Sequence, residues 1–105
     1  MSEVIKLHLT WPSRLNGLAA VEALIGENVE AWPPTGEFVL DPASPPIRYS
    51  AVEFPPIVDD AGEIVAGFHV GVWLYASPEQ LTLVQSLGAT VRLEPDLPDW
   101  WPRLG

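Results

Sequence analysis

The sequence predicts an α+β fold in which two β-α-β units form a ferredoxin-like sandwich, a mainly antiparallel sheet with two helices on one face. Two observations support this prediction. Two stretches of the chain share an order of alternating strand, Ser/Pro helix start, glycine stop, short strand and proline exit. The stretch between them lacks this order and is typical of an inserted, irregular hairpin. We therefore expect a single domain, residues 1–105, made of a first unit (4–32), an inserted middle (35–63), a second unit (64–94) and a docked, Trp- and Pro-rich C-terminal tail (95–105).

The first unit begins with a strand at residues 4–10, because apolar and polar side chains alternate there with the period of a half-buried strand. Pro12 and Ser13 mark the start of a helix, with Ser13 as its N-cap, and Gly26 marks its end. A short strand at residues 28–32 follows. One apolar stripe should turn the helix toward the core: Leu15, Leu18, Val21, Leu24 and Ile25.

The middle contains two further expected strands, GEFVLD and IRYSAVEF, which are separated by the turn-rich stretch DPASPP. The stretch DDAGE predicts an ordinary turn, because it lacks the ligand spacing of a calcium loop. Residues 64–76, IVAGFHVGVWLYA, form the strongest predicted strand of the chain, since they are rich in β-branched and aromatic side chains.

The second helix has the clearest local signal. Ser77 is its predicted N-cap, Pro78 occupies the first helical position, and Gln80 completes a capping box. Gly88 ends the helix, and residues 89–94 form the last predicted strand. The inward face of this helix is expected to consist of Leu81, Val84 and Leu87.

The composition excludes several functional classes. Acidic residues outnumber basic ones by 14 to 5, and the formal net charge is −9. Direct binding of nucleic acid or of an anionic membrane surface is not expected, because both depend on Lys and Arg. The absence of cysteine excludes disulfides and cysteine-bound metals, and it fits a reducing compartment. Without a membrane span or a signal-peptide pattern, we expect a cytoplasmic protein that carries no cofactor.

The predicted topology makes strands 4–10 and 64–76 neighbours at the centre of the sheet. Alternation then places His8, His69, Trp73 and Tyr75 on the face away from the helices. Three interpretations of this face remain open. The histidines bind a metal or act as a base; the face is exposed and binds a partner; or the middle segment or the tail covers it and makes the histidines core residues.

The tail, EPDLPDWWPRLG, is too interrupted by proline to form long regular structure. Its two tryptophans, Trp100 and Trp101, carry enough apolar surface to order a short proline-stiffened segment, so we expect it to be docked. The tail either docks on its own domain or anchors a neighbouring molecule. In the second case Asp96 and Asp99 would favour a basic partner.

These observations favour a non-enzymatic protein–protein interaction or assembly module that binds a partner or itself, as a homodimer for example. Two alternatives remain: an acidic inhibitor or decoy that occupies a nucleic-acid-binding partner, and a small enzyme or metal-binding protein that uses His8 and His69. The chain carries no family motif. Its short length and its cysteine-free, acidic and Trp-rich composition are similar to those of bacterial or phage accessory proteins. This similarity gives no individual residue a role.

Overall fold

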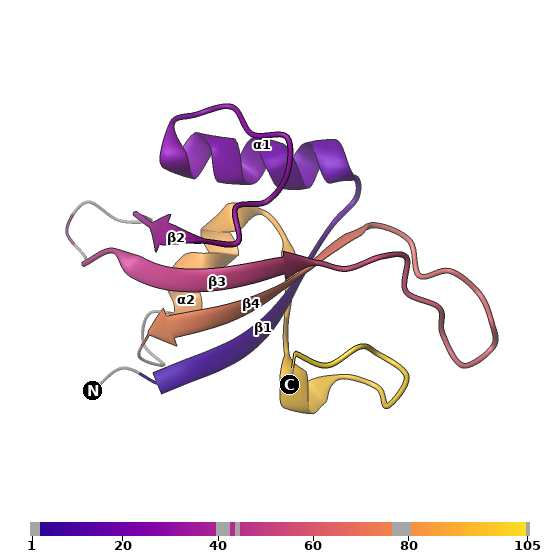
Figure 1. Cartoon of the computed structure of the whole chain (residues 1–105). Coiled ribbons are helices and arrows are strands. Elements are labelled where there is room, and N and C mark those ends of the chain that lie inside the picture. Colours follow the sequence, from indigo (N-terminus) through magenta and orange to yellow (C-terminus); the bar gives the residue numbers. More distant parts are fainter. Residues whose placement is uncertain (1–2, 40–42, 44, 77–80, 105) are drawn as a thin grey trace.

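The computed structural model of the chain describes residues 3–39, 43, 45–76 and 81–104. Within this part the strands form one antiparallel sheet in the order β2-β3-β4-β1-β5 (Figure 1). The strands are β1 (Glu3–Trp11), β2 (Thr35–Phe38), β3 (Ile47–Glu53), β4 (Phe68–Ala76) and β5 (Thr90–Leu93). The helical elements are α1 (Arg14–Ile25), α2 (Leu81–Val84) and two 3-10 turns, η2 (Gln85–Leu87) and η3 (Glu94–Asp96).

The sheet is built around the pair of strands β1 and β4. The two strands are in register along their whole length, from Glu3 opposite Ala76 to Trp11 opposite Phe68. The prediction that strands 4–10 and 64–76 are neighbours is therefore confirmed. The second of these strands begins only at Phe68, because the chain before it turns at Gly67, whose φ of 110° is unfavourable for other residues.

Helix α1 covers one face of the sheet (Figure 1). Its predicted caps are confirmed: the hydroxyl of Ser13 accepts a hydrogen bond from the amide of Asn16, and Gly26 has a left-handed φ of 74°. Leu18 and Val21 are buried against the sheet. The stripe was placed wrongly at one end, since the side chain of Leu15 is 79% exposed.

The predicted ferredoxin-like sandwich with two helices on one face is wrong. Helix α1 is the one long helix of the described residues, and the second predicted helix is represented by the single turn of α2 followed by η2. The left-handed Gly88, with a φ of 75°, ends this stretch as expected. Its predicted start at Ser77, Pro78 and Gln80 lies outside the described residues.

The strand predicted at residues 28–32 is also wrong. Apolar side chains of this segment pack against the hydrophobic core, and the segment pairs with no described strand. The ring of Trp32 is buried, and its indole N–H donates to the carbonyl of Gly17 on α1 at 3.1 Å. The sheet is completed from the expected insertion, because β2 and β3 pair with each other and β3 pairs with β4. The middle of the chain is therefore part of the main sheet.

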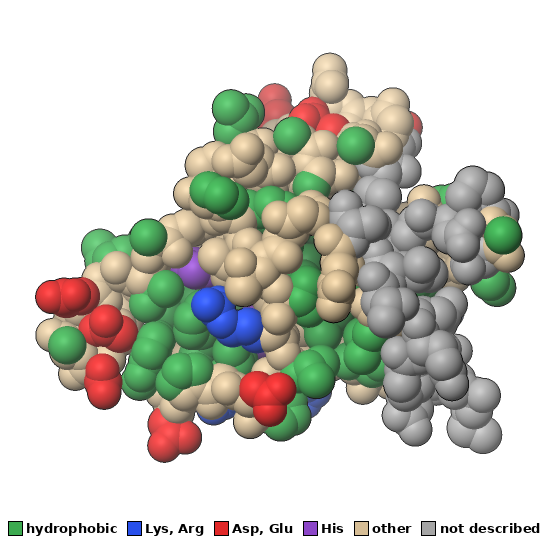
Figure 2. All heavy atoms as spheres, turned by 180° about the vertical axis from the view of Figure 1, so that it is seen from behind, with side chains coloured by type: hydrophobic (Ala, Val, Ile, Leu, Met, Phe, Trp, Pro, Cys, Tyr) green, Lys and Arg blue, Asp and Glu red, His purple; other side chains and the backbone are tan. Residues whose placement is uncertain are grey.

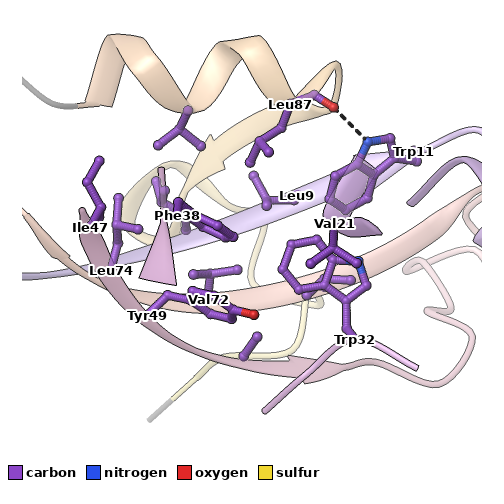
Figure 3. Close-up of a cluster of buried hydrophobic side chains, with 14 of the residues drawn as sticks. Leu9, Trp11, Val21, Trp32, Phe38, Ile47, Tyr49, Val72, Leu74 and Leu87 are labelled. Atoms are coloured by element: carbon purple, nitrogen blue, oxygen red, sulfur yellow. Dashed lines mark hydrogen bonds between the residues drawn. The ribbon is translucent and has the colours of Figure 1, made fainter. Parts of the chain in front are cut away.

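The main core fills the space between the sheet and the helical elements (Figure 3). The indole of Trp11 donates to the carbonyl of Leu87 at 3.1 Å, which fixes the end of η2 to β1. Phe38 and Tyr49 stack with ring centroids 4.2 Å apart. Among the described residues the buried hydroxyl of Tyr49 has no hydrogen-bond partner. No helix of the described part is long and apolar enough to cross a membrane.

Candidate functional site

The face of the sheet opposite α1 carries the predicted histidines, and we call it the back face. It is partly covered by a second apolar cluster, the back cluster, in which Ile57, Leu97 and Trp101 are buried and Phe54, Val65 and Trp100 pack around them. In Figure 1 the C-terminal segment lies on the side of the sheet away from α1. The middle segment and the tail thus cover His8 and His69, which are both buried.

Two hydrogen bonds determine the protonation of His8. Its Nδ1 accepts from the indole N–H of Trp101 at 3.2 Å, and its Nε2 lies 3.2 Å from a carboxylate oxygen of Glu94. A carboxylate only accepts, so the neutral ring carries its proton on Nε2. Phe54 stacks on the other side of this ring, with centroids 5.5 Å apart.

His69 is equally occupied. Its Nε2 lies 3.2 Å from the carbonyl of Val65 and therefore donates to it. Its Nδ1 lies 2.9 Å from the hydroxyl of Thr10, which acts as the donor when the ring is neutral. The rings of Trp101 and His69 pack in a T-shaped arrangement with centroids 5.2 Å apart. Trp101 therefore contacts both histidines and holds the tail across them.

Three cations surround this arrangement. The guanidinium of Arg92 lies over the ring of Trp101 at 4.9 Å, a cation–π geometry. Arg103 donates to the carbonyls of Glu94, Leu97 and Pro98, so it ties the ends of the tail together. Lys6 lies 3.7 Å from the carboxylate of Glu94. These contacts make the tail a closed loop that is fixed to β1.

The pKa values of His8 and Glu94 are both lowered, but for different reasons. Burial lowers the pKa of His8, and the charges of Arg103 and Arg92 add to this, although the contact with Glu94 opposes it. Burial alone would raise the pKa of Glu94. The hydrogen bonds from the Leu104 amide and His8, together with Lys6, outweigh burial and hold that pKa below its ordinary value.

The chemical capacity of the histidine pair is small in this state. All four ring nitrogens have partners, so neither ring can bind a metal or take a proton from a substrate while the tail is docked. The described residues contain no group of three or more His, Cys, Asp and Glu side chains that could hold a metal ion.

The covered area ends at Gly71, which allows Leu104 and Phe54 to approach the sheet; an added Cβ would collide with Leu104. Beyond Gly71 the back face is open. We call this part the open half-face. It combines apolar side chains with cations on three neighbouring strands. Its residues are Val4, Lys6, Arg48, Ser50, Val52, Trp73 and Tyr75.

The predicted binding residues thus separate into three groups. His8, His69 and Trp101 form one buried cluster, whereas Trp73 and Tyr75 belong to the open half-face. Trp100 is half-buried at the margin of the back cluster, with its ring centroid 5.7 Å from that of Trp101. Asp96 and Asp99 are exposed on the tail.

Sequence reasoning missed four residues of the cluster: Phe54, Arg92, Glu94 and Arg103. Alternation along the last predicted strand is a signal that identifies Arg92, because it shares a face with His8 once that strand lies beside β1. The other three depend on how the tail and the segment after β3 cross the sheet, for which no local pattern exists.

Comparisons with protein-family models, with curated proteins and with solved structures find no match for this chain.

Proposed function

We propose that the protein is a non-enzymatic interaction module whose contact surface is the open half-face. The observation that carries this proposal is the exposure of apolar side chains on adjacent central strands. Val4 on β1 lies directly opposite Tyr75 on β4, and their side chains are 52% and 39% exposed. Val52 on β3 is exposed beside them, and Trp73 is half-buried between them. A grouped aromatic and aliphatic surface of this kind is typical of contact sites.

Charge also distinguishes this side of the molecule. Although the net charge is −9, four of the five basic residues belong to the back face or its tail: Lys6, Arg48, Arg92 and Arg103. Arg48 lies over the ring of Tyr75 at 5.6 Å. In Figure 2 basic side chains near the middle of the view adjoin hydrophobic ones, and most of the visible acidic side chains lie toward the outline. Such a surface suits a partner with apolar and acidic groups.

The two alternative functions have less support. An enzymatic or metal-binding role would require existing contacts to break, because Glu94 and Trp101 occupy the nitrogens of His8, and Thr10 and Val65 occupy those of His69. A decoy of nucleic acid would need carboxylates gathered on one surface, whereas the central surface described above is the basic one. We also propose a cytoplasmic location, which the cysteine-free composition favours. A bacterial or phage accessory role remains a prediction from composition.

Site-specific photo-crosslinking tests this proposal. A benzophenone amino acid is placed at Tyr75 on the open half-face and, in a matched control, at Leu15, which is apolar and exposed on α1. We expect a discrete protein adduct from position 75 in cells that express the protein, and none from position 15. The same products from both positions, or none from position 75, would contradict the proposal.

A further inference from the structure

One edge of β1 is paired with a neighbouring strand along only part of its length. On the β4 side β1 is paired from Glu3 to Trp11, but on the β5 side it is paired only from Leu7 to Thr10. Strand β5 ends at Leu93, because the chain then turns away in η3, where Pro95 cannot continue a ladder. Residues 3–6 of β1 therefore present backbone donors and acceptors that no described strand pairs with. We call this segment the free edge.

A groove lies beside the free edge. Its volume is about 540 Å³, and its walls include Val4, Lys6, Leu93, Pro95 and Arg103. Glu94 also lines it, but that carboxylate is already bound by Lys6, His8 and the Leu104 amide. Arg103 contacts carbonyl oxygens and no carboxylate among the described residues. The groove thus joins apolar walls to two cations, and one of them, Arg103, has no acidic partner among the described residues.

A hairpin elsewhere on the same chain has a surface complementary to this groove. Residues 57–65 form a hairpin in which Val58 pairs with Ile64, the Asp59 amide donates to Glu63, and the Val65 amide donates to Ile57. The Asp59 carboxylate closes the turn by accepting from the amides of Ala61 and Glu63, each at 2.9 Å. We call it the acidic hairpin. In Figure 1 it projects from the end of the sheet opposite the N-terminus.

The outer surface of the acidic hairpin is apolar and negatively charged. Val58 and Ile64 are 50% and 69% exposed, and Asp60 and Glu63 flank the turn. Its inner side, with Ile57 and Val65, is held by the back cluster. The hairpin is therefore a preformed strand pair, and its docking would require little ordering of the chain.

We propose that the acidic hairpin of one copy adds to the free edge of the next copy by β-strand addition. Ile64 or Val58 enters the groove beside Val4, and Asp60 and Glu63 approach Lys6 and Arg103. Donor and acceptor surfaces lie at opposite ends of the molecule, so the contact is heterologous and produces chains or rings rather than a closed two-fold dimer. This inference rests on the proposed interaction function and identifies a second copy as one partner.

Sedimentation velocity on the full chain and three variants tests it, from about 10 μM to about 1 mM, a range that detects weak association. Val4→Asp blocks the free edge, Ile64→Asp blocks the hairpin, and Leu15→Asp is the matched control on α1. All three positions are exposed, so each variant should fold, which thermal unfolding checks. Val58→Asp serves as a second hairpin variant.

We expect the wild type and Leu15→Asp to associate with increasing concentration. Val4→Asp and Ile64→Asp alone should associate at least about tenfold more weakly, as expected when a charge enters an apolar contact. Their equimolar mixture should form a heterodimer and nothing larger, because each variant retains the surface that the other lacks.

A wild type that is monomeric at every concentration would overturn the inference. A mixture of Val4→Asp and Ile64→Asp that stays monomeric would also overturn it. A hairpin variant that associates like the wild type would overturn it as well, because that result indicates an edge-to-edge dimer. None of these results bears on the crosslink at position 75, so failure of this inference and failure of the proposed function remain distinguishable.

Discussion

At the scale of single residues, His8 links the tail to the sheet through a proton. The indole N–H of Trp101 requires an unprotonated Nδ1, so a second proton on the ring would place two donors against each other. The charged groups facing this ring from β5 and the tail are Arg92, Glu94 and Arg103. Two of them are cations and oppose the charged ring, and the carboxylate alone favours it.

Acid should therefore destabilise the fold in two stages. The pKa of His8 is lowered from 6.5 in the folded chain, so the unfolded chain takes up the proton first and stability falls as the pH drops below about 6.5. The pKa of Glu94 is lowered from 4.5, so a further loss follows below about 4.5. Urea denaturation at a series of pH values measures this.

The variant His8→Gln is the control for the first stage. It cannot gain a proton, so its free energy of unfolding should change less than that of the wild type between pH 7.5 and the start of the second stage. A wild-type protein that gains stability as the pH falls from 7 to 5 would show that the described geometry of His8 is wrong.

Two hydroxyls, one buried without a partner and one partly buried with partners, provide a comparison. That of Tyr49 has no partner among the described residues, and burial raises its pKa. That of Thr10 lies between His69 and Arg92. Tyr49→Phe should leave stability unchanged or raise it, whereas Thr10→Val should cost about 1–3 kcal/mol. Thermal and urea unfolding measure both, and equal losses would contradict the assigned hydrogen bonds.

At the scale of elements, sequence succeeded where one local pattern determines the structure. The Ser13 cap, the Gly26 stop and the alternation of His8 with its neighbours needed no tertiary information. It failed at residues 28–32, where Trp32 binds α1 instead of a strand. The sequence-based prediction also failed for the length of the second helix and for the pairing of β2 and β3 with the main sheet. Both depend on which surfaces the rest of the chain leaves free.

The tail shows the same division. Its aromatic content predicted docking, but the choice between its own sheet and a neighbour depends on the space that Gly71 leaves and on the Arg103 contacts. A chain ending at Pro95 loses the burial of Leu97 and Trp101. We expect it to lose about 4 kcal/mol or more of stability, because one buried tryptophan removes about 150–250 Å² from water.

Thermal unfolding of the truncated chain, with Trp101→Phe as a milder comparison, measures this loss. The phenyl ring keeps part of the packing and removes the indole donor to His8. A truncated chain with the melting temperature of the full chain would mean that the tail is not docked on the back face.

At the scale of the whole molecule, the parts of β1 and β4 around His8 and His69 are covered on both sides, whereas the rest of their back face is open. On each strand one set of alternate side chains, such as Leu7 and Val72, enters the main core under α1, and on the other face His8 and His69 contact Trp101 of the back cluster. Hydrogen exchange should therefore be slowest at Leu7, Leu9, Val70 and Val72, and faster in the acidic hairpin and in η3. Exchange of α1 amides slower than that of these strands, measured by NMR, would contradict this order.

The difference between the two faces of β1 also protects its pairing with β4. If β1 slipped by one residue against β4, every side chain would change faces. His8 would enter the aliphatic core under α1, away from Glu94 and Trp101, and Leu7 and Leu9 would meet the tail. A buried imidazole without partners costs free energy, and so does the exposure of leucine. The two histidines thus raise the free energy of the mispaired sheet relative to the correct one. They favour the correct pairing already during folding, before the protein binds any partner.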